Sequence, residues 1–440
     1  MFVSIGPAIQ VAYGVGMKFS AVDAAFMKHT IYRDGQFHLL TTRDGNNRVL
    51  PLAWAICETE SGETYAWFAE QCVDAGLGRY LSGCSVIFSD RMKGIAQFHE
   101  RFDSSVGSCF KHIIDNARKA CKGTGRTFED AMAWILQKAP TESAYLRQLA
   151  VLRTVCAPAA LYFDEQCNHD HVYQYRWNEL KMATHGFKTS QIVECQNGNF
   201  VEARMEAPYR FNYMLLLWVG KEFEARPKDM KAWVAKGHIL TPYAHEEFRI
   251  QVWAQPLAYM GPSTHMHHDH RLGPICVQTE IAKRSGVQVT GCGRTVYQLQ
   301  DMRSADGKKY EVDLENLDCC DYVHTHQLPC RHMVPVFHSR SMMSSPRKVE
   351  QCIAKFWPKW ALASEYIKIY EPRAIHIPPV YSGPFVGPDA ERLKAPIQSH
   401  RKRGRPKKKR YRWTRQTVAT VKERLPQIHN NEYSSLFEYM

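Results

Sequence analysis

The sequence predicts an α/β fold in which a mixed sheet is layered with helices. The apolar run over residues 18–26 is typical of a buried strand, and two further apolar runs flank the turn Asp44-Gly45-Asn46-Asn47, as in a hairpin. Helical spacing follows over residues 64–76, and a short apolar run over residues 84–90 ends on a carboxylate. Together with a helix expected over residues 93–102, this alternation is that of a layered α/β domain.

Beyond this sheet the sequence becomes helical. Apolar side chains recur at spacings of three and four, which predicts an all-helical insertion at about residues 125–185. Two more helices are expected over residues 189–206, where Ser190 is a candidate N-cap, and over residues 213–225. We therefore assign residues 1–250 to the first domain.

The remaining chain is predicted to hold smaller units. Residues 256–345 form a Cys- and His-rich region, and residues 346–395 a helix and a proline-rich linker. A basic arm at 396–416 and a tail at 417–440 follow, and this basic end is expected to be disordered.

The charge distribution separates the body of the chain from this arm. The 440 residues include 57 Lys and Arg against 44 Asp and Glu, which gives a net charge of +13. Ten basic residues and no acidic residue lie between Arg401 and Arg415, so most of the excess charge is local. Such a segment is typical of nucleic-acid binding or nuclear import.

Membrane insertion and secretion are not expected. The longest apolar runs are too short for a membrane span. The mildly apolar amino-terminal stretch has no basic residues before it, whereas a secretory signal would. The 14 Cys are scattered along the chain, so metal binding or core packing is favoured over disulfide bonding.

Three acidic residues have positions that suit metal chemistry. Asp23 lies in the first predicted strand, Asp90 ends the fourth, and Glu194 lies on the helix expected after residue 189. Carboxylates at these points can converge on one edge of a sheet, as two-metal phosphoryl transfer requires. Spacing alone leaves surface or capping roles open for each of them.

Successive blocks of residues 2–225 resemble the Mutator-like element transposase domain. The blocks are VDAAFMKH, DGNNRVLPLAWAICETESGETYAWF, VIFSDRMKGI, CFKHIIDNARK and HGFKTSQIVECQNGNFVEARMEAP, in the order that the family has. The resemblance implies a ribonuclease-H-like fold with a DDE triad at Asp23, Asp90 and Glu194, holding Mg²⁺ or Mn²⁺. Cys109 and His112 match the family's CxxH block and are candidate supporting residues of the active site, although a packed Cys and a hydrogen-bonded His remain an alternative.

Residues 308–336 resemble a SWIM zinc finger, whose form is CxC, a spacer and then CxH. Cys330 and His332 match the second pair, but Cys319 and Cys320 are adjacent instead of separated by one residue. Successive side chains on a strand point to opposite faces, so both Cys can bind Zn²⁺ only if the backbone kinks there. The resemblance implies zinc at these four residues and a role in binding DNA or protein.

Other Cys and His arrangements stay open. One of the two adjacent Cys could act with His324 or His326, which still gives a four-ligand site, and the module could also be zinc-free. A separate His cluster is expected to be a solvated loop; it comprises His265, His267, His268 and His270.

The basic arm resembles an AT-hook. Gly allows close backbone approach, Pro keeps the chain extended, and Arg side chains fit a narrow A·T-rich minor groove. Neighbouring Lys residues would add phosphate attraction, while a nuclear-import signal or a solvated tail is the alternative. The candidate DNA-binding residues are Arg403, Gly404, Arg405, Pro406, Lys407, Lys408, Lys409 and Arg410.

The resemblance implies a nuclear DNA transposase that cleaves double-stranded DNA at the terminal inverted repeats of its element and then transfers strands, acting as a homo-oligomer at paired ends. The alternative is a domesticated, transposase-derived DNA-binding transcriptional regulator without catalytic activity. A stand-alone ribonuclease-H-like nuclease would not account for the SWIM-like region and the basic arm. Family members commonly carry a further amino-terminal DNA-binding module, so either this chain is a truncated, inactive copy or end recognition rests on its carboxy-terminal half.

Overall fold

The computed structural model describes residues 1–29, 32, 35–91, 93–257, 287–291, 296–301, 309–316, 318–339 and 356–375. These residues all belong to one compact unit, Met1–Val386. None of the helices in this part of the chain combines the length and the apolar character that a membrane span requires. The residues of the predicted basic arm lie outside the described part.

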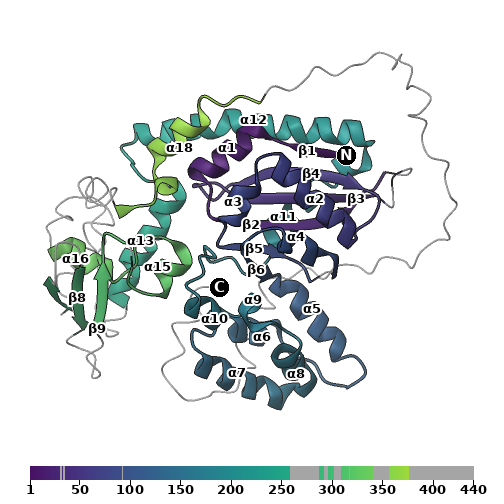
Figure 1. Cartoon of the computed structure of the whole chain (residues 1–440). Helices are drawn as coiled ribbons and strands as arrows, with labels where there is room; N and C mark the ends of the chain where they lie inside the picture. The colour runs from purple at the N-terminus through teal and green to yellow at the C-terminus, as the bar shows by residue number, and fades with distance from the viewer. Residues whose placement is uncertain are drawn as a thin grey trace, which may run out of the picture. The chain divides into compact units, whose positions relative to one another are not determined.

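A six-stranded mixed sheet lies at the centre of the first half of the chain (Figure 1). The first four strands in space pair antiparallel, and the last two join β2 in parallel. Their spatial order is β1 (Phe2–Ser4), β4 (Val49–Cys57), β3 (Gln36–Arg43), β2 (Phe19–Phe26), β5 (Val86–Ser89) and β6 (Ser105–Ser108). The predicted α/β class with a mixed sheet is confirmed.

Several elements have no counterpart in the sequence prediction, among them the edge strands β1 and β6 and the helix α1 (Gly6–Val15). Strand β1 has three residues and β6 has four, which is too short for a periodic pattern to be detected. Helix α1 contains two glycines and only one strongly polar side chain, so its sequence shows no polar face.

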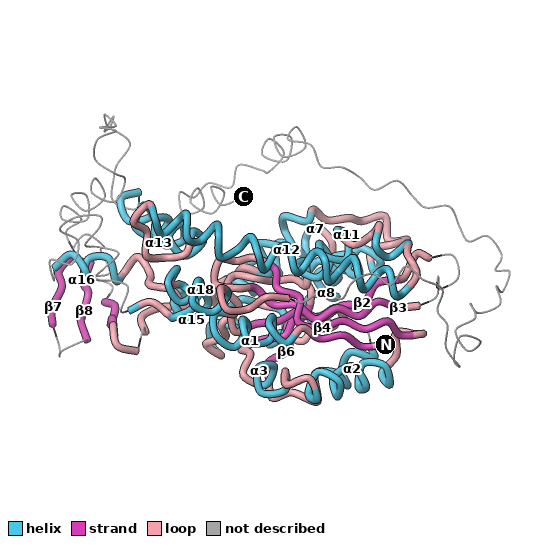
Figure 2. The backbone as a smooth tube through the Cα atoms, turned by 90° about the horizontal axis from the view of Figure 1, so that it is seen from above, coloured by secondary structure: helices cyan, strands magenta, loops and turns pink. Residues whose placement is uncertain are grey.

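Helices cover both faces of the sheet. Figure 2 shows α2 (Gly62–Asp74) and α3 (Gly78–Ser82) on one side, and α11 (Gln191–Asn199) and α12 (Pro208–Ala235) on the other. Helix α2 begins where Ser61 forms a capping box: its Oγ accepts from the Thr64 amide at 3.3 Å, and Thr64 Oγ1 accepts from the Ser61 amide at 2.9 Å. The helix predicted over residues 213–225 is longer at both ends.

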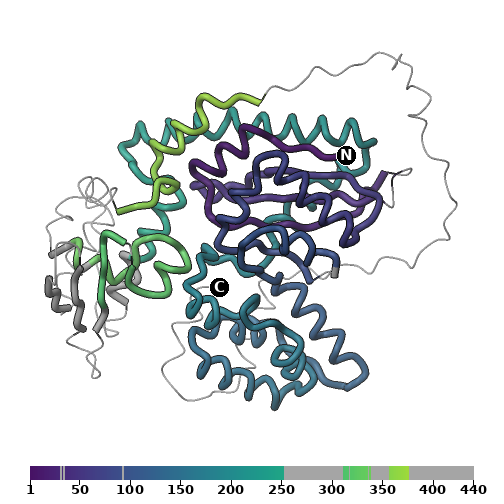
Figure 3. The backbone as a smooth tube through the Cα atoms, viewed as in Figure 1, coloured from purple at the N-terminus to yellow at the C-terminus, as the bar shows by residue number. Residues whose placement is uncertain are grey.

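A group of helices between β6 and α11 has its own apolar core. Side chains from α5 to α8, together with Val172, Tyr173 and Tyr175, are buried against one another, apart from the core of the sheet. Figure 3 shows these segments, blue to teal, gathered below the sheet. The helices are α5 (Phe110–Ala120), α6 (Asp130–Gln137), α7 (Glu142–Val155), α8 (Ala157–Glu165), α9 (His169–Val172) and α10 (Gln174–Glu179).

The second half of the chain contributes a three-stranded antiparallel sheet and short helices. The strands β7 (Val287–Gly291), β8 (Val296–Asp301) and β9 (Lys309–Asp313) pair in that order. The helical elements are α13 (Pro242–Leu257), α15 (Asp321–His326), α16 (Met333–Ser339), η4 (Lys359–Ala361) and α18 (Ala363–Tyr370); short elements of the first half are η1 (Lys93–Ile95), α4 (Ala96–Glu100) and η2 (Ala203–Met205).

Helix α18 lies in the segment that the sequence predicts to be a helix and a proline-rich linker. It packs into the apolar core of the six-stranded sheet. Figure 3 shows it, in yellow-green, beside α12 and the purple α1. The hydroxyls of Tyr366 and Tyr370 each donate to Asp44 Oδ2 at 2.8 Å, and Arg226 of α12 donates to the same oxygen at 2.9 Å. The turn after β3 is therefore the anchor that joins α12 and α18.

Gly45→Ala is expected to destabilise this anchor. A Cβ atom at Gly45 would lie 1.8 Å from the carbonyl oxygen of Trp360, which is backbone and has to move. Overpacking of this kind costs about 1 to 3 kcal/mol, which chemical denaturation can measure. Gly6→Ala is the matched control because a Cβ there meets nothing within 4 Å, and equal stability of the two variants would contradict the packing.

Candidate functional site

The three predicted carboxylates come from three elements of the sheet domain. Asp23 lies within β2, and Asp90 directly follows β5, the parallel neighbour of β2. The register pairs Ala21 with Phe88, so Asp23 and Asp90 each lie two residues beyond a paired position. Glu194 lies in the first turn of α11, which packs against β2 and β3.

Charge repulsion connects the three acids. Burial, together with the nearby Asp90 and Glu194 carboxylates, raises the pKa of Asp23 to about 7, although His112 opposes the shift. The carboxamide of Asn197 donates to Asp23 Oδ2 at 3.1 Å. A cation would relieve the repulsion at this position.

Glu194 lies at the centre of a small polar cluster. Its Oε1 accepts from Ser190 Oγ at 3.0 Å and from Cys109 Sγ at 3.3 Å, and His112 Nδ1 lies 3.6 Å from the same oxygen. Ligand atoms of Cys109, His112 and Glu194 lie within 4.8 Å of one another, a spacing that can hold a metal ion. Among the described residues the three carboxylates do not form such a group by themselves, and they interact over a longer range.

Ser190 occupies the N-cap position of α11, as expected, but does not act as a side-chain cap. Its hydroxyl donates to Glu194 and accepts no backbone N–H of the first turn. The side chain of Ser190 therefore contacts the Glu194 carboxylate rather than the backbone amides of the first turn.

The sequence prediction missed several polar neighbours of the carboxylates. Asn197 follows Glu194 by three residues and Ser190 precedes it by four, a spacing that places all three on one helical face. Glu60 lies just before α2 and accepts from the Tyr65 hydroxyl at 2.9 Å; burial raises its pKa, and Asp90 adds to the shift. The helical spacing was visible in the sequence, whereas the approach of Glu60 to Asp90 depends on the tertiary fold.

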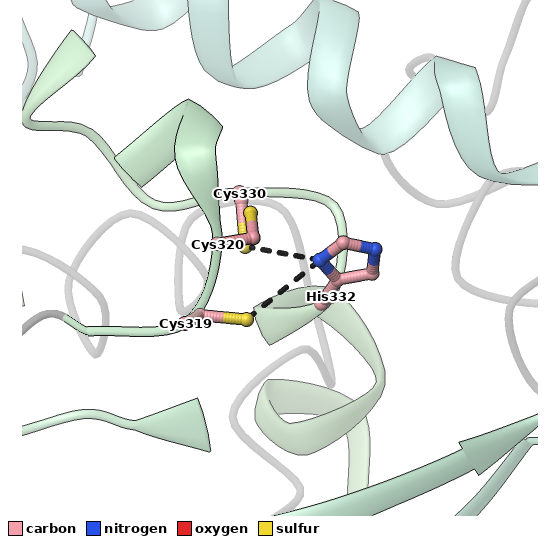
Figure 4. Close-up of side chains that lie close together, drawn as sticks. All are labelled: Cys319, Cys320, Cys330 and His332. Atoms are coloured by element: carbon pink, nitrogen blue, oxygen red, sulfur yellow. Dashed lines mark hydrogen bonds between the residues drawn. The ribbon is translucent and has the colours of Figure 1, made fainter. Parts of the chain in front are cut away.

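A second site gathers the four predicted zinc ligands. Figure 4 shows the side chains of Cys319, Cys320, Cys330 and His332 directed toward one another. Their ligand atoms all lie within 4.8 Å of one another. His332 Nδ1 lies 3.7 Å from Cys319 Sγ and 3.8 Å from Cys330 Sγ.

The adjacent Cys319 and Cys320 can both face one ion only if the backbone bends there, and the structure has such a bend. The backbone bends at Cys319 and Cys320, and Cys320 then becomes the N-cap of α15. The bend follows a bridge between Asp313 and Asp318 and lets both thiols face Cys330. Hydrogen bonds from Cys319 and then Cys330 lower the pKa of Cys320, which favours a thiolate there.

These distances suit a tetrahedral metal site. With Zn–S near 2.3 Å and Zn–N near 2.0 to 2.1 Å, a sulfur and a nitrogen ligand lie roughly 3.6 Å apart. The two Sγ to Nδ1 distances, 3.7 and 3.8 Å, are close to this value. The cluster can therefore hold a metal ion such as zinc.

The alternative histidines have other partners. His324 Nε2 lies 2.7 Å from Asp318 Oδ1, and the ring of His326 stacks on Tyr322 with centroids 4.4 Å apart. Neither belongs to the group of ligand atoms found in the described residues. The histidines of residues 265–270 and the AT-hook-like residues 403–410 lie outside the described part of the chain.

No protein-family model matches the chain, and no curated protein sequence is significantly similar to it.

Proposed function

We propose that this chain is a metal-dependent DNA-cleaving and strand-transferring enzyme of the Mutator-like transposase class, with Asp23, Asp90 and Glu194 as its catalytic carboxylates. The observation that carries the proposal is the electrostatic coupling of these acids, which come from two neighbouring parallel strands and one helix. Carboxylates held together in this way are stabilised by a divalent cation.

The sheet topology supports the ribonuclease-H-like fold that the sequence resemblance implies. Three core strands run antiparallel in sequence order, β2 to β4, and β5 and β6 then continue from β2 in parallel. In this order the first and fourth core strands, β2 and β5, are parallel neighbours. Asp23 lies in the first of these strands, and Asp90 directly follows the fourth.

The side chains of the site would divide the work between cation binding and orientation. Asp23, Asp90 and Glu194 would hold Mg²⁺ or Mn²⁺, which supplies activation of a water or 3′-hydroxyl and charge stabilisation of the leaving oxygen. Cys109 and Ser190 orient the carboxylate of Glu194. His112 lies where it can contact a phosphate or a further ligand of the cation.

DNA binding is assigned to the second half of the chain in this proposal. The metal-binding Cys and His cluster would stabilise a SWIM-like module with zinc, and the basic arm would contact A·T-rich minor grooves. An enzyme of this class would act in the nucleus. It would also form an oligomer that pairs two element ends.

Asp90→Ala should abolish metal-dependent strand nicking. We would incubate the full-length chain with supercoiled plasmid carrying candidate element ends, in Mg²⁺, in Mn²⁺ and in EDTA, and measure relaxed DNA on gels. Asp103→Ala is the matched control, because Asp103 is an exposed residue of the turn before β6. Wild type and the control should nick, whereas Asp90→Ala and the EDTA samples should not.

The other results would overturn the proposal in defined ways. Equal nicking by Asp90→Ala and wild type would place the activity outside the three carboxylates. DNA binding without nicking by either protein would favour the regulator that lacks catalytic activity.

A further inference from the structure

Helix α11 presents three polar side chains to the candidate active site from a single face. Ser190, Glu194 and Asn197 are spaced by four and three residues, so their side chains lie one above another along the helix. Glu194 is a proposed metal ligand, whereas the other two are donors that contact carboxylates. Each donor acts on a different acid.

The first donor set fixes one oxygen of Glu194. Ser190 Oγ donates to Glu194 Oε1 at 3.0 Å, and Cys109 Sγ donates to the same oxygen at 3.3 Å. Both donor residues have 0% exposure. Both contacts end on Oε1, so Oε2 is the oxygen that can take a cation without breaking either of them. The geometry therefore favours Glu194 as a monodentate ligand that binds the cation through Oε2.

The second donor fixes one oxygen of Asp23. Asn197 Nδ2 donates to Oδ2 at 3.1 Å, three residues farther along the helix than Glu194. The buried Arg204 links the end of α11 to the end of β2, because it donates to the carbonyl of Asn197 at 2.7 Å and to that of Phe26 at 2.8 Å. Phe26 ends β2, the strand that carries Asp23, so the helix and the strand are tied together beside the site.

We infer that Ser190 and Asn197 are positioning residues that determine which oxygens of Glu194 and Asp23 face a divalent cation. The inference rests on the proposed function and assigns roles to two side chains outside the acidic triad. Groups that orient metal ligands commonly change metal affinity by 10- to 100-fold when they are removed. Loss of Asn197 removes its contact with Asp23, and loss of Ser190 leaves Glu194 held by the Cys109 thiol, so in each case the second carboxylate oxygen can compete for the cation.

Ser190→Ala and Asn197→Ala should each raise the Mn²⁺ concentration for half-maximal nicking by about 10-fold. Ser190→Thr retains the hydroxyl and should stay close to wild type, whereas Asn197→Asp places a like charge against Asp23 and should exceed the effect of Asn197→Ala. Gln191→Ala is the control on the same helix, because this side chain is exposed and should leave the metal requirement unchanged.

Direct Mn²⁺ binding gives a readout that does not depend on catalysis. Titration of the full-length proteins, followed by the electron paramagnetic resonance signal of free Mn²⁺, should show the same order of affinities. A purely structural role would lower the melting temperature of Ser190→Ala and Asn197→Ala and leave their Mn²⁺ affinity at the wild-type value, which would overturn the inference.

The two assays separate this inference from the proposed function. If wild type nicks and the alanine variants require no more metal, the positioning role is wrong and the transposase proposal stands. If wild type does not nick but binds Mn²⁺ more tightly than the variants, the catalytic proposal is wrong and the positioning role stands. If wild type neither nicks nor binds Mn²⁺, both are wrong.

Discussion

Asp44→Ala is expected to lower the free energy of unfolding by about 3 to 5 kcal/mol, because it removes the buried carboxylate that pairs with Arg226 and leaves only the partly exposed Glu222 as its ion-pair partner. The side chains of this ion pair are 0% and 2% exposed, and their shortest N to O distance is 2.9 Å. The hydroxyls of Tyr366 and Tyr370 would lose the same acceptor. Urea denaturation should show the loss, and amide exchange should accelerate in α18.

A second ion pair between the same turn and α12 provides the control. Arg48 and Asp229 lie 3.3 Å apart, but their side chains are 40% and 65% exposed, so Asp229→Ala should cost less than about 1 kcal/mol. Adding Arg226→Met to Asp44→Ala should cost less than the sum of the two single changes, since no buried charge is then left unpaired. Equal destabilisation by Asp44→Ala and Asp229→Ala would show that the buried pair does not anchor the turn.

The central strands could be predicted because their signals are local. Long apolar runs identify β2, β3 and β4, and the turn at Asp44 to Asn47 joins the last two of them as a hairpin. The anchoring role of Asp44 has no such signal. Its partners lie 182, 322 and 326 residues farther along the chain, and a periodic pattern carries no information about contacts at that separation.

The residues of the candidate active site differ in how well the sequence alone could predict them. Spacing could not select Asp23, Asp90 and Glu194 among 44 acidic residues, and the family resemblance supplied that choice. Parallel pairing of β2 with β5, which brings the first two together, involves strands about 67 residues apart. By contrast, Ser190 and Asn197 share a helical face with Glu194, so their proximity to that residue follows from local spacing alone.

The adjacent cysteines show where a local rule depends on the backbone. Opposite orientation of Cys319 and Cys320 holds for an extended strand, but the chain bends at both residues and α15 begins at Asp321. The bend brings the thiols to the same side, and the departure from the CxC pattern does not prevent all four ligand atoms from meeting.

Zinc bound at this cluster should be lost in His332→Ala and retained in His324→Ala. His332 Nδ1 lies within 3.8 Å of two thiols, whereas His324 contacts Asp318. We would measure metal content by mass spectrometry after purification without chelators; wild type and His324→Ala should contain about one zinc per chain, as a four-ligand site binds a single ion. Equal zinc content in both variants would contradict the ligand assignment.

Removal of zinc should also unfold the segment around the cluster. Structural zinc contributes about 10 to 16 kcal/mol of apparent binding free energy in small zinc-binding peptides, and that energy stabilises the fold because the unfolded chain has no preformed site. Cys330 is fully buried beside Met333 and Val334, so loss of the ion would leave crowded thiols next to an apolar cluster. A strong chelator should therefore accelerate amide exchange over residues 318–339 and leave exchange in β2 to β4 unchanged. Uniform acceleration across both regions would mean that the ion stabilises the whole unit, and no change in either region would mean that these residues fold without it.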